Sequence, residues 1–266
     1  MTITRRAANL PLWTLLGAVI ALLTLLVPAP AVAGEALPTD LRIWPNAQSR
    51  ANSDAWLAER HDLLLQMRPR ILVLNFANGL APAKGLALVD SIIAALRESS
   101  RYHGWEDKSA APFLECEVAK YVDLQDAAPP SDPLDGNSTR YPRVPGWTSG
   151  INFQYRRLFE ADFAAHYGYP DPDNPGRFLP LVALVERGLV HEVWFLAYQR
   201  KHGAPFESVE VKQAWDAGFR KIPGRSVQAG NGGDPAQPFI GRSLRIGFIN
   251  AERGPGCFLE SLAHSY

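Results

Sequence analysis

The hydrophobic pattern contains four short segments with the character of β-strands. Residues 71–76, 189–197 and 244–250 are nearly continuous apolar runs, which is typical of strands covered on both faces in a parallel sheet. Residues 113–124 alternate between apolar and polar side chains, so this segment is expected to be a half-exposed strand at a sheet edge.

Between these runs, apolar residues recur at helical spacing. The clearest case is residues 83–100, where Val89, Ile93 and Leu96 share one face, directly after a strand and a polar turn. Further helices are predicted over residues 54–67, 152–167, 180–187 and 212–219, and after residue 250.

Strands that alternate with amphipathic helices predict an α/β fold. We expect a mainly parallel open sheet of four or more strands with helices on both faces, as in flavodoxin-like and Rossmann-like folds. Residues 126–150 and 222–241 are rich in proline and glycine and are expected to be long loops. The predicted organisation is a signal peptide at 1–33, a leader with a short helix at 34–68, and a single α/β domain at 69–266.

The first 33 residues have the layout of a secretory signal peptide. Arg5 and Arg6 precede an apolar run from Leu10 to Val27, and Ala31-Val-Ala33 supplies small residues for cleavage. The protein is therefore expected to be secreted or periplasmic after cleavage near Ala33. The alternative is an uncleaved N-terminal transmembrane anchor, because a run of this length is just long enough to span a bilayer.

Charge and cysteine content narrow the possible partners. Loss of residues 1–33 removes two of the 27 basic residues and none of the 27 acidic ones, so the mature chain carries a net charge of −2. A nearly neutral chain without a basic stripe is not expected to bind nucleic acid. Cys116 and Cys257 are compatible either with one disulfide bridge or with two separate thiols.

Polar side chains follow the carboxyl ends of the predicted strands, which meet at one edge of an open parallel sheet, where ligands bind. The candidate catalytic residues are Glu252, Glu207 and Arg253, and the candidate substrate-binding residues are Asn75, Tyr198, Ser208 and Asn250. The two glutamates would act as general acid and base, and the arginine would orient an anionic or carbonyl group. A structural role for Glu252 stays open, because a glutamate in the first turn of a helix is favoured by the helix dipole.

Glu260 and His264 form a possible metal-binding pair. They are four residues apart and would share one face of the last predicted helix. A carboxylate and an imidazole suit Zn²⁺, although the sequence shows no third ligand. The alternative is an ordinary side-chain pair near the end of a helix.

The loop at 126–150 offers a different kind of site. It carries Tyr141 and Trp147, which could either bind a ligand or anchor the loop. It also contains the sequon Asn137-Ser-Thr139, which would matter only in a host that glycosylates its exported proteins.

The chain contains RILVLNF at 70–76, LVERGLVHEVWF at 184–195, FES at 206–208 and RIGFINAERGPGCFLESLAH at 245–264. Together these segments resemble a family of secreted bacterial proteins with a C-terminal Asn-x-Glu-Arg-Gly…Leu-Glu…His motif. The resemblance implies an exported protein with a functional edge but implies no particular reaction. The matched polar residues are Asn75, Glu192, Glu207, Ser208, Asn250, Glu252, Arg253, Glu260 and His264.

These observations lead to two functional hypotheses. The first is a hydrolase that acts on an extracytoplasmic glycan or peptide, with carboxylate acid and base residues at the carboxyl edge of the strands. The second is a non-catalytic module that binds an extracytoplasmic ligand. Contact with a membrane is expected only through an uncleaved N-terminal segment.

N-terminal sequencing of the protein purified from the exporting host should return a sequence that begins at Gly34, because cleavage is expected after Ala33. A mature protein that retains residues 10–27 would instead establish the anchored form.

Overall fold

A computed structural model of the chain describes residues 37–49, 54–101, 106–131, 136–148, 151–199, 205–218, 220–229 and 237–263. The chain divides into two units, Met1–Glu35 and Ala36–Tyr266, and all described residues belong to the second. Within the described ranges, no helix combines the length and the apolar character needed to cross a bilayer. The apolar run at 10–27 lies outside these ranges.

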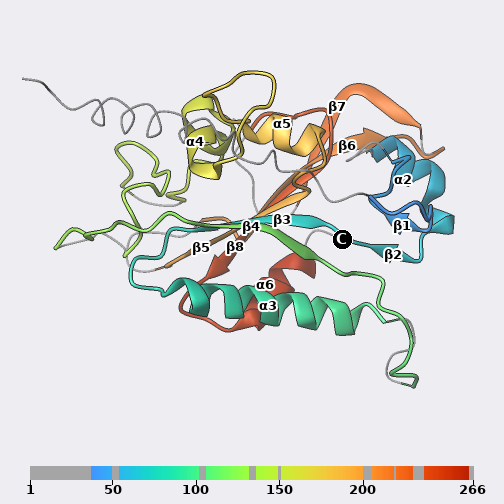
Figure 1. Cartoon of the computed structure of the whole chain (residues 1–266), viewed down its shortest axis with the longest axis horizontal. Helices are drawn as coiled ribbons and strands as arrows, with labels where there is room; N and C mark the ends of the chain where they lie inside the picture. Colours follow the sequence, from blue (N-terminus) through green and yellow to red (C-terminus); the bar gives the residue numbers. More distant parts are fainter. Residues whose placement is uncertain are drawn as a thin grey trace, which may run out of the picture. The chain divides into compact units, whose positions relative to one another are not determined.

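The second unit is organised around a six-stranded sheet with the order β4-β3-β5-β8-β6-β7 (Figure 1). β4 lies at the edge, as its alternating pattern predicted, and the three apolar runs form the adjacent strands β3, β5 and β8. The strands are β3 (Arg70–Asn75), β4 (Glu117–Asp123), β5 (Glu192–Ala197), β6 (Ser208–Trp215), β7 (Lys221–Ala229) and β8 (Leu244–Asn250).

The prediction of a mainly parallel, Rossmann-like sheet is wrong, because the sheet is mixed. β3 pairs in parallel with β4 and β5, and β5 with β8, whereas β6 pairs antiparallel with both β8 and β7. The segments predicted as a helix at 212–219 and a loop at 222–241 contribute instead to the β6–β7 hairpin. Asp216 closes its turn by accepting hydrogen bonds from the amides of Gly218 and Arg220.

Alternation along β6 explains this difference. Val209 and Val211 are buried, and both pack toward one face of the sheet, while Glu210 and Lys212 point toward the other. This period of two is the pattern of a strand. Pairing with β7 continues the strand to Trp215, into the segment for which a helix was predicted. Register with β8 then fixes the antiparallel direction.

The two faces of the sheet are covered differently (Figure 1). One face packs against α3 (Pro82–Ser99) and α6 (Pro255–Ala263), with Ile71, Val73 and Trp194 in the core between them. The other is covered by short elements that enclose a larger aromatic core. They are η2 (Tyr155–Phe159), η3 (Ala161–Phe163), α4 (Ala164–Tyr167) and α5 (Leu181–Glu186).

The single helix predicted over 152–167 is also wrong. Glu160 is extended, with φ −77° and ψ 147°, and divides the segment into two 3₁₀ turns and one short helix. Tyr155 and Tyr167 are fully buried, and the ring of Phe153 stacks on that of Phe195 at 4.3 Å. Aromatic residues are weak helix formers, so their packing on the sheet decides the local backbone.

The segment before β3 packs at the amino ends of the parallel strands. It contains β1 (Ile43–Trp44), α2 (Asp54–Arg60), η1 (His61–Leu63) and β2 (Gln66–Met67). The helix was predicted over 54–67, but α2 covers only the first half of that range. Trp44 is 4% exposed, and its ring lies 4.6 Å from that of His191 at the start of β5. Trp44 of the predicted leader is thus buried against the start of β5.

Gly247 in β8 is needed for close packing of α6. A Cβ atom at this position would lie 2.7 Å from Cε2 of Phe258, which is far inside van der Waals contact. We expect Gly247→Ala to lower the free energy of unfolding by about 1–3 kcal/mol, the usual range for overpacking.

Urea unfolding of this variant should be compared with that of Gly254→Ala, since a Cβ at Gly254 meets nothing within 4 Å. Equal midpoints for the two variants would contradict the packing assigned to Phe258.

Candidate functional site

Three of the four predicted substrate-binding residues lie at the carboxyl edge. Asn75 ends β3, Asn250 ends β8 in register with Ala197, and Tyr198 follows β5 directly. The backbone carbonyl of Glu207 accepts a hydrogen bond from the amide of Phe248, at 2.9 Å, so Glu207 also lies near this edge.

The side-chain amides of Asn75 and Asn250 at this edge form hydrogen bonds that hold the adjacent loops in place. Asn75 donates to Oδ1 of Asp123 at 3.2 Å and accepts from the amide of Ala77 at 3.1 Å. Asn250 donates to Oε1 of Gln199 and accepts from the amide of Glu252, both at 2.9 Å. Bonds of this kind stabilise turns after strands and leave these side chains few groups for a ligand.

The 126–150 loop is anchored by the same kind of contact. Asn137 accepts from the amide of Tyr198 at 2.8 Å and donates to its carbonyl at 3.1 Å, and Asn137 is only 2% exposed. The sequon asparagine is thus buried against β5 in the folded chain. Tyr141 is also buried and donates to Oδ1 of Asn152 at 2.7 Å, so it anchors the loop and is not available as a contact surface.

The remaining predicted site residues occupy varied environments. Ser208 is fully buried, whereas Glu252, Arg253 and Glu260 are exposed. His264 lies outside the described residues, and the described part of the chain contains no group of three or more potential metal ligands. The zinc hypothesis therefore remains untested.

Both cysteines are free thiols in this structure. Burial raises the pKa of Cys116 to about 12, so this thiol is protonated at neutral pH. Arg253, in the turn before α6, donates to the sulfur of Cys257 in the first part of that helix, at 3.7 Å.

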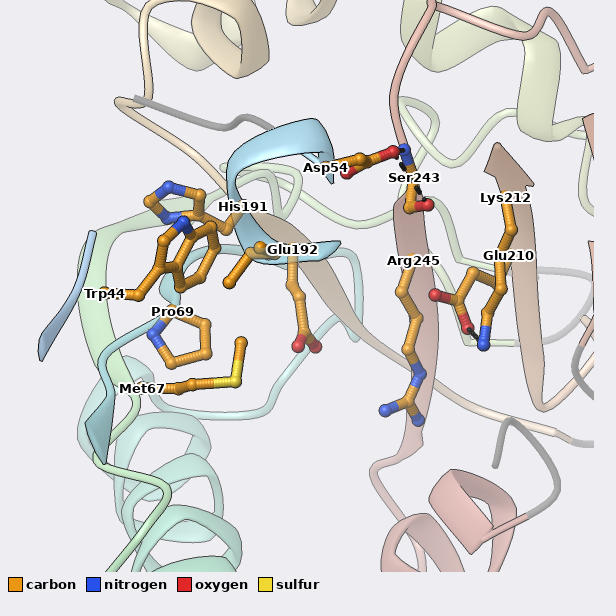
Figure 2. Close-up of a pocket in the computed structure, with 11 residues that line it drawn as sticks. Trp44, Asp54, Met67, Pro69, His191, Glu192, Glu210, Lys212, Ser243 and Arg245 are labelled. Atoms are coloured by element: carbon orange, nitrogen blue, oxygen red, sulfur yellow. Dashed lines mark hydrogen bonds and ion pairs between the residues drawn. The ribbon is translucent and has the colours of Figure 1, made fainter. Parts of the chain in front are cut away.

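A cavity of about 200 Å³ lies at the opposite, amino end of the parallel strands (Figure 2). None of the predicted catalytic, substrate-binding or metal-binding residues lines it, whereas Glu192, one of the residues matched by the resemblance, does. Four of its charged residues come from the sheet, namely Glu192 of β5, Arg245 of β8, and Glu210 and Lys212 of β6, and a fifth, Asp54, comes from α2.

Strand register brings the charged residues of the cavity together. Arg245 is paired with Glu192 on one side and with Glu210 on the other, so the three residues lie in one row across β5, β8 and β6. Paired residues of neighbouring strands point to the same face of a sheet. Figure 2 shows the guanidinium of Arg245 and the carboxylate of Glu192 extending in the same direction.

Arg245 is the unusual member of this row. It is 5% exposed, and none of its three guanidinium nitrogens has a hydrogen-bond partner. Its contact is with the ring of Phe258, whose centroid lies 5.4 Å from Cζ. A buried charge without hydrogen bonds is strongly unfavourable, by several kcal/mol, and buried polar groups in proteins are usually satisfied.

The two glutamates have different surroundings. Glu192 accepts a hydrogen bond from Nε1 of Trp194 at 2.8 Å, a neutral donor on the same strand. Glu210 lies 3.4 Å from Nζ of Lys212. Burial raises the pKa of Glu210 above its usual value, while Lys212 and Arg245 oppose this effect.

The outer wall of the cavity comes from the segment before β3. Trp44, Leu57, Met67 and Pro69 supply its apolar part. Asp54 at the start of α2 accepts from the amide and the hydroxyl of Ser243, at 2.8 and 3.1 Å, and so attaches α2 to the entry of β8.

A second cavity, of about 230 Å³, is lined by Asp54, Glu186, Lys221 and Arg242 among others. No member of this set is among the buried side chains that lack a hydrogen-bond partner. The cavity at Arg245 is therefore the stronger candidate.

No family model, curated protein or solved structure matches this chain. The resemblance to secreted bacterial proteins stays a prediction, and the cavity is the feature of the structure that bears on function.

The resemblance includes Glu192 among its matched polar residues, but the sequence pattern did not lead to Arg245 or Glu210. Glu192 and Arg245 interrupt segments that are otherwise largely apolar. A charged residue at a buried strand position needs a partner, so these interruptions were the signal that could have located the site.

The raised pKa of Glu210 predicts a pH-dependent effect of Glu210→Gln. The folded protein favours the protonated carboxyl, so ionisation of Glu210 destabilises the fold as the pH rises above the ordinary value of 4.5. The variant should match the wild type in free energy of unfolding at pH 4 or below and exceed it at pH 7.

Urea unfolding across this pH range checks the effect, with Glu117→Gln on the exposed side of β4 as the control for loss of one charge. If Glu210→Gln were less stable than the wild type at pH 7, the assigned burial penalty would be wrong.

Proposed function

We propose that this protein binds a small molecule with an anionic group in the cavity at the amino ends of the parallel strands. The observation that supports this proposal is the buried guanidinium of Arg245, none of whose nitrogens is hydrogen-bonded. A carboxylate, phosphate or sulfate group on the ligand would supply the missing acceptors.

The chemistry of the guanidinium favours an oxyanion. Its planar fork of N–H donors matches the geometry of carboxylate and phosphate and can bond them in a bidentate manner. Because the group is shielded from water, its hydrogen bonds to an anion would be stronger than those of an exposed arginine. The contact with Phe258 holds the guanidinium in place before the ligand arrives.

Hydrolysis of an extracytoplasmic glycan or peptide is the second candidate function. Two carboxylates flank the cavity in unlike surroundings, and the pKa of Glu210 is raised by burial. A carboxyl whose pKa is raised by burial, placed beside a second carboxyl, is an arrangement found in acid–base catalysis. In this form of the hypothesis, Glu192 and Glu210 replace Glu207 and Glu252 as the acid and base.

Removal of the Arg245 guanidinium should weaken anion binding. We expect pentanoate or inorganic phosphate to raise the melting temperature of the wild type, and Arg245→Met to weaken binding by about 10- to 100-fold. This factor corresponds to the ~1.5–3 kcal/mol of hydrogen bonds to a charged group. Titration calorimetry with the same two probes gives the affinities.

Arg253→Met is the matched control, because Arg253 is exposed and lies after the carboxyl end of β8. Loss of binding in Arg253→Met but not in Arg245→Met would move the site to the carboxyl edge. Arg245→Lys is a second variant in case Arg245→Met fails to fold, because lysine keeps the positive charge but lacks the planar set of N–H donors. Absence of any response of the wild type to both anions would overturn the proposal.

A further inference from the structure

The charges around Arg245 also limit the kind of anion that can bind, and this step rests on the proposed function. Glu192 and Glu210 occupy the neighbouring positions of the row, one strand away on each side. Adjacent strands lie about 4.8 Å apart, so both carboxylates are close enough to repel a ligand that carries only negative charge.

The two carboxylates are not equivalent. Glu210 has a cation nearby, since Nζ of Lys212 lies 3.4 Å from its carboxylate. Glu192 forms no ion pair with any residue that the structure describes, and its one hydrogen bond comes from the neutral indole of Trp194. The row thus presents a guanidinium and a carboxylate on adjacent strands, each without a partner of opposite charge at ion-pair distance.

Arg245 and Glu192 do not neutralise each other, although they are register partners. Their side chains extend in parallel toward the cavity (Figure 2), and no hydrogen bond joins them. A ligand that carries both charges on groups attached to one carbon would satisfy both residues in a single binding event.

The size of the cavity and the polarity of its walls also indicate a small ligand with an apolar part. A cavity of about 200 Å³ lies below the ~300–1,000 Å³ that drug-sized ligands occupy, so the ligand is small. Beyond the charged row, Trp44, Leu57 and Met67 form an apolar wall that would favour a hydrophobic substituent.

We infer that the cavity binds a zwitterion of the α-amino-acid type. The carboxylate pairs with Arg245, the ammonium group pairs with Glu192, and an apolar side chain packs against Trp44, Leu57 and Met67.

Calorimetry with matched probes tests this inference on the mature wild-type protein. The probes are leucine, methionine and phenylalanine, their deaminated analogues 4-methylpentanoate, 4-(methylthio)butanoate and 3-phenylpropanoate, and the corresponding amino-acid amides. We expect at least one amino acid to bind tenfold or more tightly than both its deaminated acid, which lacks the ammonium group, and its amide, which lacks the carboxylate.

Glu192→Gln supplies the second readout. This variant keeps the shape of the side chain and removes its charge, so it should lose affinity for the amino acid while keeping or gaining affinity for the deaminated acid. Glu192→Asp should restore part of the preference for the amino acid. Glu117→Gln, which removes an exposed carboxylate from β4, should leave both affinities unchanged.

The experiment distinguishes failure of the zwitterion inference from failure of the anion-binding proposal. If the deaminated acids bind as tightly as the amino acids and both depend on Arg245, the zwitterion is overturned and anion binding stands. If only inorganic phosphate binds, the inference is likewise overturned. If the wild type binds neither these probes nor any simple anion, both proposals are overturned.

Discussion

The register of β8 between β5 and β6 is the constraint on which the cavity depends. It places Arg245 in one row with Glu192 and Glu210 on the face covered by α3 and α6. Successive residues of a strand point to opposite faces, so a slip by one residue would move the guanidinium into the aromatic core, where Leu244 and Ile246 now lie. The hydrophobic residues of β8 therefore fix the position of its charge.

The two ends of the parallel strands differ in how their polar groups are used. At the carboxyl edge, Asn75, Asn137 and Asn250 bond to neighbouring loops and hold the chain in turns. At the amino end, the guanidinium of Arg245 remains without hydrogen bonds despite its burial. Satisfied groups stabilise the fold, whereas an unsatisfied buried charge destabilises it until a partner arrives. This contrast favours the amino end as the place where a ligand binds.

The segment before β3 forms the outer wall of the cavity. The two hydrogen bonds between Asp54 and Ser243 and the contact of Trp44 with His191 attach this segment to the strands. None of the residues of α2 is fully buried, so its position rests on a small number of contacts. A ligand that touches Leu57 and Arg245 together would add to the stability of this attachment.

The sequence by itself determined the local elements whose periodicity is strong. The apolar runs at β3, β5 and β8, the amphipathic helix α3 and the edge strand β4 were all predicted, because burial on one or both faces leaves a regular pattern along the chain. Only the tertiary structure decided the direction of β6, the irregular turns between 152 and 167, and the end of the sheet that carries the cavity. These features depend on partners distant in sequence: β6 takes its direction from β8, and Phe153 packs on Phe195. Whether a polar side chain is satisfied or free for a ligand depends on the same long-range neighbours, which no local pattern records.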